Sequence, residues 1–186
     1  MDNLTNKIIK KAPDRMAEYH QHLINQIIKK QKFPEILKIS KIIQISKKGK
    51  PKYEIDSFRP IDNLPSTEKI IEEWLKINME KHIKYNQILN KNHHSTVTAK
   101  LSLELEAIKE KEDKKTSAIV STDLSSAYNT ISHRILELKL EHYGFRNETG
   151  KLLKSYLSNR RQFVQIQSKR SQTKRIPNAS VIQGTN

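Results

Sequence analysis

Apolar positions along the chain follow either helical or strand spacing, and this spacing predicts most of the elements. Met16, Leu23 and Ile27 recur at helical intervals over residues 14–31, which predicts an amphipathic helix. Over residues 39–45, isoleucines instead alternate with polar residues, as expected for a half-buried strand. Further helices are predicted over 67–85, 97–110, 133–143 and 152–157, and a turn with a second strand over 158–167.

A short buried strand is predicted at Ala118–Val120, where small and β-branched residues follow one another. Asp123 comes just after it, where the pattern becomes polar. A carboxylate at a strand end, followed by a turn and a helix, can hold a Mg²⁺ ion that also binds a nucleotide's phosphates. An aspartate that merely starts a turn has the same local pattern. The pattern alone leaves both interpretations open.

Composition narrows the class of partner. The 186 residues carry a net charge of +15, which favours a polyanion such as nucleic acid or an anionic membrane surface. The absence of cysteine excludes a disulfide framework and any Cys-ligated zinc site. No apolar run reaches membrane-spanning length and the first residues do not resemble a signal peptide. We therefore expect an intracellular protein of the nucleus or cytoplasm, without a membrane partner.

Two segments concentrate the positive charge. Residues 29–52 contain nine lysines and one acid, with Gly49 and Pro51 at the tip of a predicted loop. Such a run is either a solvated face or a mobile loop that places cations over a triphosphate. Residues 151–175 contain eight basic residues and no acid, a composition typical of a phosphate-binding surface. The candidate nucleic-acid-binding residues are Arg160, Arg161, Lys169, Arg170, Lys174 and Arg175.

The segment from Asp123 to His133 reads Asp-Leu-Ser-Ser-Ala-Tyr-Asn-Thr-Ile-Ser-His. It resembles the first catalytic motif of reverse transcriptases from non-LTR retrotransposons, which the family writes Asp-Leu-x-x-Ala-Phe/Tyr-Asp-x-Val/Ile-x-His. Asn129 departs from that pattern, because the family usually has a second aspartate there. Other segments resemble the family in the same order along the chain: Phe58–Ile61, Lys69–Glu72, Leu89–Ala99, Ser158–Gln167 and Ala179–Thr185.

The resemblance implies an α+β fold of the right-hand polymerase type, with fingers and an incomplete palm, rich in helix and with a small antiparallel sheet. It divides the chain into an N-terminal helical segment at 1–32, fingers at 33–113 and a partial palm at 114–186. The palm would end shortly after the Gln-Gly motif. We expect the central palm strand to end at Asp123.

The family's chemistry implies roles for particular residues. RNA-directed DNA polymerases transfer nucleotides with two Mg²⁺ or Mn²⁺ ions, and by resemblance Asp123 and the carbonyl of Leu124 would bind metal. Tyr128 would lie beneath the incoming sugar and exclude a 2′-hydroxyl. The triphosphate would be neutralised by Arg59, Lys52 and Lys50, and the incoming nucleotide would be contacted by Gln183 and Gly184. The implied partners are an RNA template, a DNA primer and a deoxynucleoside triphosphate.

Reverse transcriptases carry a second carboxylate motif, an aromatic-x-Asp-Asp hairpin, after the Gln-Gly segment, and this sequence contains no Asp-Asp pair. We therefore expect a fragment of a retroelement reverse transcriptase that does not polymerise by itself and whose partners include the remainder of the polymerase. Whether the chain alone is an enzyme stays open. The alternative is a non-catalytic, basic nucleic-acid-binding protein derived from a reverse transcriptase.

Overall fold

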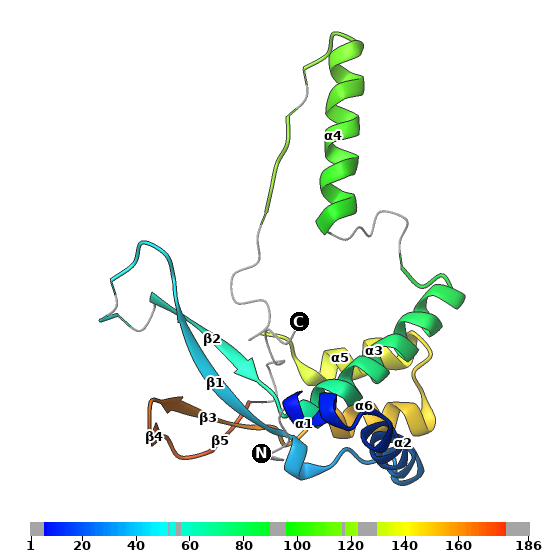
Figure 1. Cartoon of the computed structure of the whole chain (residues 1–186). Coiled ribbons are helices and arrows are strands. Elements are labelled where there is room, and N and C mark those ends of the chain that lie inside the picture. The colour runs from blue at the N-terminus through cyan, green and yellow to red at the C-terminus, as the bar shows by residue number, and fades with distance from the viewer. Residues whose placement is uncertain are drawn as a thin grey trace. The chain divides into compact units, whose positions relative to one another are not determined.

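The computed structural model describes residues 6–51, 53–54, 57–89, 96–116, 118–122 and 130–177 (Figure 1). This part of the chain has an α+β fold, as predicted, in which six α-helices accompany a small sheet. In chain order the elements are α1 (Asn6–Lys11), α2 (Pro13–Lys30), the 3₁₀ turn η1 (Glu35–Leu37), β1 (Ile39–Ser46), β2 (Phe58–Asn63), α3 (Ser66–Tyr85), α4 (Thr96–Glu112), α5 (His133–His142), α6 (Asn147–Leu157), β3 (Arg161–Ile166), β4 (Lys169–Arg170) and β5 (Lys174–Arg175).

Helices α2 to α5 begin and end within two residues of the predicted positions, whereas α6 begins at Asn147, five residues before its predicted start. In α2, Pro13 stands at the start, where its missing N–H is not needed for a helical hydrogen bond. Gln31 ends the helix in the left-handed region at φ 50°, and its N–H donates to the carbonyl of Ile28. After α5, Gly144 adopts φ 91°, a conformation that glycine reaches without a Cβ clash. Local signals therefore determine these helix ends.

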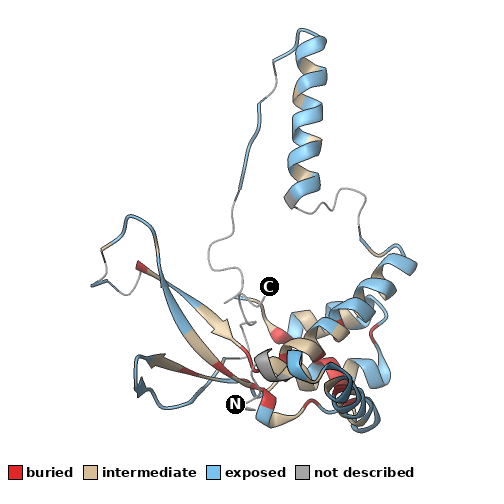
Figure 2. Cartoon of the chain, viewed as in Figure 1, coloured by how far each residue is buried: buried red, intermediate tan, exposed pale blue. Residues whose placement is uncertain are grey.

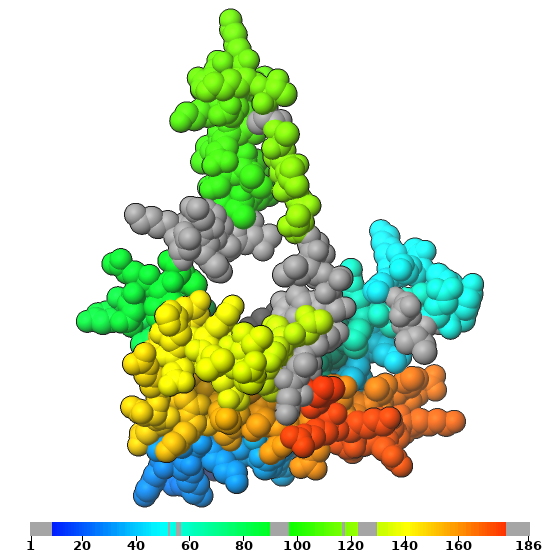
Figure 3. Space-filling view, turned by 180° about the vertical axis from the view of Figure 1, so that it is seen from behind, coloured from blue at the N-terminus to red at the C-terminus, as the bar shows by residue number. Residues whose placement is uncertain are grey.

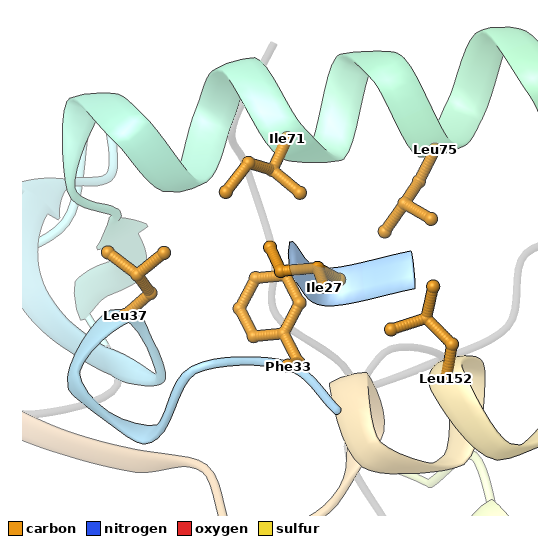
Figure 4. Packing of buried hydrophobic residues seen from close by; sticks show 6 residues of the cluster. All are labelled: Ile27, Phe33, Leu37, Ile71, Leu75 and Leu152. Atoms are coloured by element: carbon orange, nitrogen blue, oxygen red, sulfur yellow. The ribbon is translucent and has the colours of Figure 1, made fainter. Parts of the chain in front are cut away.

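The hydrophobic core lies between α2, α3 and α6, with the segment that follows α2 filling its centre. Figure 4 shows its side chains pointing toward one another: Ile27, Phe33, Leu37, Ile71, Leu75 and Leu152. Phe33 and Ile71 are both 0% exposed. Burial of each such side chain contributes about 1.5–3 kcal/mol to folding. Trp74 packs against this cluster while staying partly exposed. The core thus joins segments far apart in sequence.

The sheet is mixed, so the prediction of an antiparallel sheet was wrong. The strand order is β2-β1-β3-β4, and β5 also pairs with β3. β1 runs antiparallel to β2, and β3 runs antiparallel to β4 and β5, but β1 and β3 are parallel from Ile39–Arg161 to Ile42–Val164. Parallel neighbours need a long connection. Here α3, α4, α5 and α6 all lie between β1 and β3 in the chain.

The predicted buried strand at Ala118–Val120 is also wrong. Residues 118–122 form no strand, and Ile119 and Val120 are 66% and 88% exposed. β-branched residues favour a strand only where a neighbouring strand satisfies their backbone N–H and carbonyl groups. None of the five described strands pairs with this segment. The local composition was therefore insufficient to place it in a sheet.

Contacts divide the chain into two units, which are described separately. The larger comprises described residues of 1–78 and 126–186, and the smaller those of 79–125. The smaller unit contains α4, whose surface is mostly exposed (Figure 2). The division into fingers and palm stays a prediction. Across the described helices, none combines the length and apolar character needed to cross a bilayer.

Candidate nucleic-acid interface

Three arginines of the C-terminal strands share one face of the sheet. Side chains alternate between faces along a strand, and paired residues point to the same face. Arg161 pairs with Arg175, and Gln165 pairs with Arg170. Because Arg161 and Gln165 are four residues apart on β3, all three arginines lie on the same side. All three are exposed.

The register of β1 and β2 adds two more cations to this side. Lys41 on β1 pairs with Phe163, the residue between Arg161 and Gln165 on the same face of β3. Arg59 on β2 pairs with Ile45, which lies on the same face of β1 as Lys41. We name this set the arginine face, and its members are Lys41, Arg59, Arg161, Arg170 and Arg175. In Figure 3 the strands β3–β5, orange to red, form exposed surface next to the cyan β1–β2 region.

The opposite face of the sheet has a different charge pattern. Lys169 and Lys174 are the neighbours of Arg170 and Arg175 in sequence, and alternation places both on this opposite face. Asp62 also lies there, since it pairs with Ile42 and accepts a hydrogen bond from the Ser40 hydroxyl at 2.6 Å. The acidic residue of the described strands thus lies away from the arginine face.

A cation–π contact holds one arginine of the face in place. The guanidinium carbon of Arg170 lies 3.8 Å from the ring centroid of Phe163. The Arg170 guanidinium also donates to the Thr173 hydroxyl at 3.2 Å. Phe163 itself is only 4% exposed, so its ring is not open to stack on a nucleic-acid base. The ring instead orients a cation that stays exposed.

The β1–β2 hairpin carries two of the predicted triphosphate-binding residues. The loop between the two strands is closed at its base by a hydrogen bond, in which the N–H of Lys47 donates to the carbonyl of Ser57 at 2.7 Å. Gly49 adopts φ 78° in the turn, which glycine tolerates because it has no Cβ. Lys50 and Arg59 are both exposed. Lys52, the third predicted residue, lies outside the described residues.

Arg160 differs from the other five predicted nucleic-acid-binding residues because it is buried. It is 6% exposed, and its Nη1 donates to Glu68 Oε1 at 2.6 Å. Its Nε donates to the carbonyl of Tyr156 at 2.8 Å, and its guanidinium lies 4.2 Å from the Tyr156 ring centroid. The structure therefore places Arg160 inside the larger unit, as a link between α3 and the start of β3.

A second, partly buried set of contacts lies next to this ion pair. The Tyr156 hydroxyl donates to Glu72 Oε1, and the neighbouring Ser155 hydroxyl accepts from the N–H of Phe33 at 3.0 Å. The rings of Phe33 and Tyr156 meet edge to face with centroids 5.1 Å apart. Together these contacts attach α6 to α3 and to the segment after α2. Sequence reasoning missed this network, although glutamates within an otherwise apolar helical row were a signal for it.

The network changes the acidity of its carboxyl groups. Burial raises the pKa of Glu68 to about 7, and the attraction of Arg160 only partly opposes that rise. Burial likewise raises the pKa of Glu72, against the hydrogen bond from Tyr156. Burial also raises the pKa of Tyr156, so its hydroxyl remains a donor. The protonation of these groups therefore contributes to the free energy of unfolding.

Several predicted catalytic residues lie outside the described residues, namely Asp123, Leu124, Tyr128, Gln183 and Gly184. Their mutual geometry therefore stays a prediction. Among the residues that the structure describes, no group of three or more histidine, cysteine or acidic side chains could hold a metal ion.

The chain belongs to the reverse transcriptase family. The family described as reverse transcriptase (RNA-dependent DNA polymerase) matches residues 45–185. This match confirms the family that the ordered motifs indicated, and its region includes the arginine-rich strands β3, β4 and β5 as well as most of the β1–β2 hairpin.

Curated relatives from Drosophila melanogaster match nearly the whole chain. The probable RNA-directed DNA polymerase from transposon BS is 29% identical over 197 residues, covering 100% of this chain and 21% of the relative. The corresponding protein from transposon X-element is 28% identical, covering 90% of this chain and 19% of the relative. The RNA-directed DNA polymerase from mobile element jockey is 27% identical, and the match covers 99% of this chain and 20% of the relative. The chain thus spans about a fifth of the length of these relatives.

Proposed function

We propose that the chain is the part of a retroelement RNA-directed DNA polymerase that binds template, primer and incoming nucleotide. Family membership supports the reaction class, and the relatives are named for that activity. One structural observation carries the binding function: exposed basic residues from three separate strands gather on one face of the sheet. Such a surface attracts the phosphates of an RNA template and a DNA primer.

The motif resemblance assigns the catalytic roles within this proposal. Asp123 and the Leu124 carbonyl are the candidate ligands of Mg²⁺ or Mn²⁺, which would supply Lewis-acid chemistry when bound. Tyr128 would select deoxynucleotides, and Gln183 with Gly184 would contact the incoming nucleotide. By the same resemblance, we propose that residues 33–113 form the fingers and residues 114–186 part of the palm.

The hairpin between β1 and β2 is the proposed triphosphate contact. Arg59 lies exposed on β2, and Lys50 lies exposed in the turn that Gly49 shapes. A guanidinium can bind phosphate oxygens with two parallel hydrogen bonds, whereas an ammonium acts as a point charge. Lys52 is assigned to the same contact by its position in the sequence.

Salt dependence of RNA binding tests the binding function. The purified chain is titrated into a short fluorescent single-stranded RNA, and anisotropy gives the affinity between about 50 mM and about 200 mM salt. Counterion release predicts a linear fall of the logarithm of the affinity with the logarithm of salt concentration. Absence of binding at the lowest salt, or an affinity that salt does not change, would contradict the proposal.

Primer extension separates a polymerase from a nucleic-acid-binding protein without catalysis. The purified chain is incubated with a primed RNA template, deoxynucleotides and Mg²⁺, beside the Asp123→Ala variant. Incorporation that disappears in the variant would assign catalysis to this chain. RNA binding of equal strength in both proteins, without incorporation in either, would assign binding alone.

A further inference from the structure

We propose that the arginine face is the nucleic-acid-contacting side of the sheet, and that it binds the phosphodiester backbone independently of base sequence. This inference rests on the proposed binding function and makes it more specific. Among the predicted basic residues it selects Arg161, Arg170 and Arg175. It excludes Lys169 and Lys174, which alternate to the opposite side, and Arg160, which is buried.

The arginine face contains a like-charge pair. Arg161 and Arg175 are direct cross-strand partners on the same face, and like charges in this position destabilise a sheet. Neither arginine forms an ion pair with any residue that the structure describes. A phosphate between the two guanidinium groups would convert the repulsion into two charge-assisted interactions. This pair is therefore suited to an anion supplied by a ligand.

Further positive charges surround that pair. Lys41, Arg59 and Arg170 extend the positive charge over β1, β2 and β4, and the described strands place no acid on this face. On the other side, Asp62 accompanies the two lysines. The electrostatic potential is thus expected to favour a polyanion on the arginine face.

The side chains of this face favour contact with backbone phosphates over contact with bases. Arg170 stacks on Phe163, and that ring is 4% exposed. Stacking on bases needs an open aromatic ring, and the described strands present none on this side. The guanidinium and ammonium groups of this face instead contact phosphates, and such contacts carry no direct sequence information. We therefore expect the same affinity for RNAs of different base sequence.

The test compares reversals of charge on the two faces. The double variant Arg170→Glu/Arg175→Glu is matched with Lys169→Glu/Lys174→Glu, which has the same change in net charge on the same two strands. Lys29→Glu/Lys30→Glu in α2 controls for net charge away from the sheet. Anisotropy of a fluorescent RNA measures affinity at several salt concentrations, and circular dichroism checks folding.

We expect the arginine variant to lose at least about tenfold in affinity, with a salt slope lower by about two, one for each phosphate contact removed. The lysine and α2 variants should lose only about two- to threefold, because they change the long-range field alone. Should the glutamates unfold the strands, Arg170→Gln/Arg175→Gln provides the same comparison with Lys169→Gln/Lys174→Gln.

Each outcome decides the proposal. An equal loss in the arginine and lysine variants, or a larger loss in the lysine variant, would overturn the assignment of the face while leaving RNA binding intact. A strong dependence on base sequence would overturn backbone recognition. Failure of the unmodified chain to bind RNA at low salt would overturn the proposed binding function and this inference with it.

Discussion

Arg160 Nη1 lies 2.6 Å from Glu68 Oε1, and this buried ion pair joins two residues that are 92 positions apart in the sequence. Glu68 is 0% exposed and Arg160 is 6% exposed. Directly after Arg160, the N–H of Arg161 donates to the Lys38 carbonyl at 2.9 Å and begins the pairing of β3 with β1. The ion pair therefore anchors the end of β3 from which the arginine face extends.

Removal of the Arg160 side chain should strongly destabilise the larger unit. Arg160→Ala leaves the Glu68 carboxyl buried without its partner, at a cost of about 3–5 kcal/mol. Arg161→Ala is the matched control, since the adjacent side chain is exposed and should change stability by less than about 0.5 kcal/mol. Urea unfolding followed by circular dichroism measures both. Similar midpoints for the two variants would contradict the structural role of Arg160.

Stability should depend on pH through Glu68. Its pKa is raised by burial to about 7 from an ordinary value of 4.5, so between these values the folded chain retains a proton that the unfolded chain has released. The contribution of this group to the free energy of unfolding therefore falls as pH rises through that window, and levels off above it.

The variant Glu68→Gln isolates this effect, because Glu72 and every other titrating group stay in both proteins. Urea unfolding at several pH values from about 4.5 to about 7.5 should show a weaker fall of stability with pH in the variant. Parallel curves for the two proteins would show that Glu68 does not titrate in this range.

The hydroxyl of Tyr156 should contribute to stability through Glu72. Tyr156→Phe keeps the ring against Phe33 and Arg160 but removes the donor to Glu72. Loss of a hydrogen bond to this partly buried carboxyl group should cost about 1–3 kcal/mol. Tyr85→Phe, at a residue 88% exposed, serves as the control and should be neutral. Thermal unfolding of both variants provides the measurement, and equal effects would argue against the network.

Two isoleucines of α3 provide a test of the core. Ile71 is 0% exposed and Ile77 is 43% exposed. Ile71→Ala should cost about 2–5 kcal/mol, because it leaves a cavity between α2, α3 and α6. Ile77→Ala deletes the same atoms from the same helix and should cost less than about 1 kcal/mol. A larger loss at Ile77 would place the core on a different side of α3.

The sequence by itself determined the positions of most helices and the family. The helical spacing of Met16, Leu23 and Ile27, for example, was sufficient to place α2, because an amphipathic helix is specified by residues three or four apart. The ordered motifs indicated a reverse transcriptase, which the family match confirmed. Both conclusions depend on residues that lie close together in the sequence, within one helix or within one motif.

Only the tertiary structure decided what neighbouring basic residues do. Arg160 and Arg161 are adjacent and chemically identical, yet one is buried against Glu68 and the other is exposed opposite Arg175. The parallel pairing of β1 with β3 and the exposure of Ile119 and Val120 were likewise not predicted. Each of these outcomes depends on partners many residues away, and strand pairing and burial are set by such long-range contacts and not by local composition.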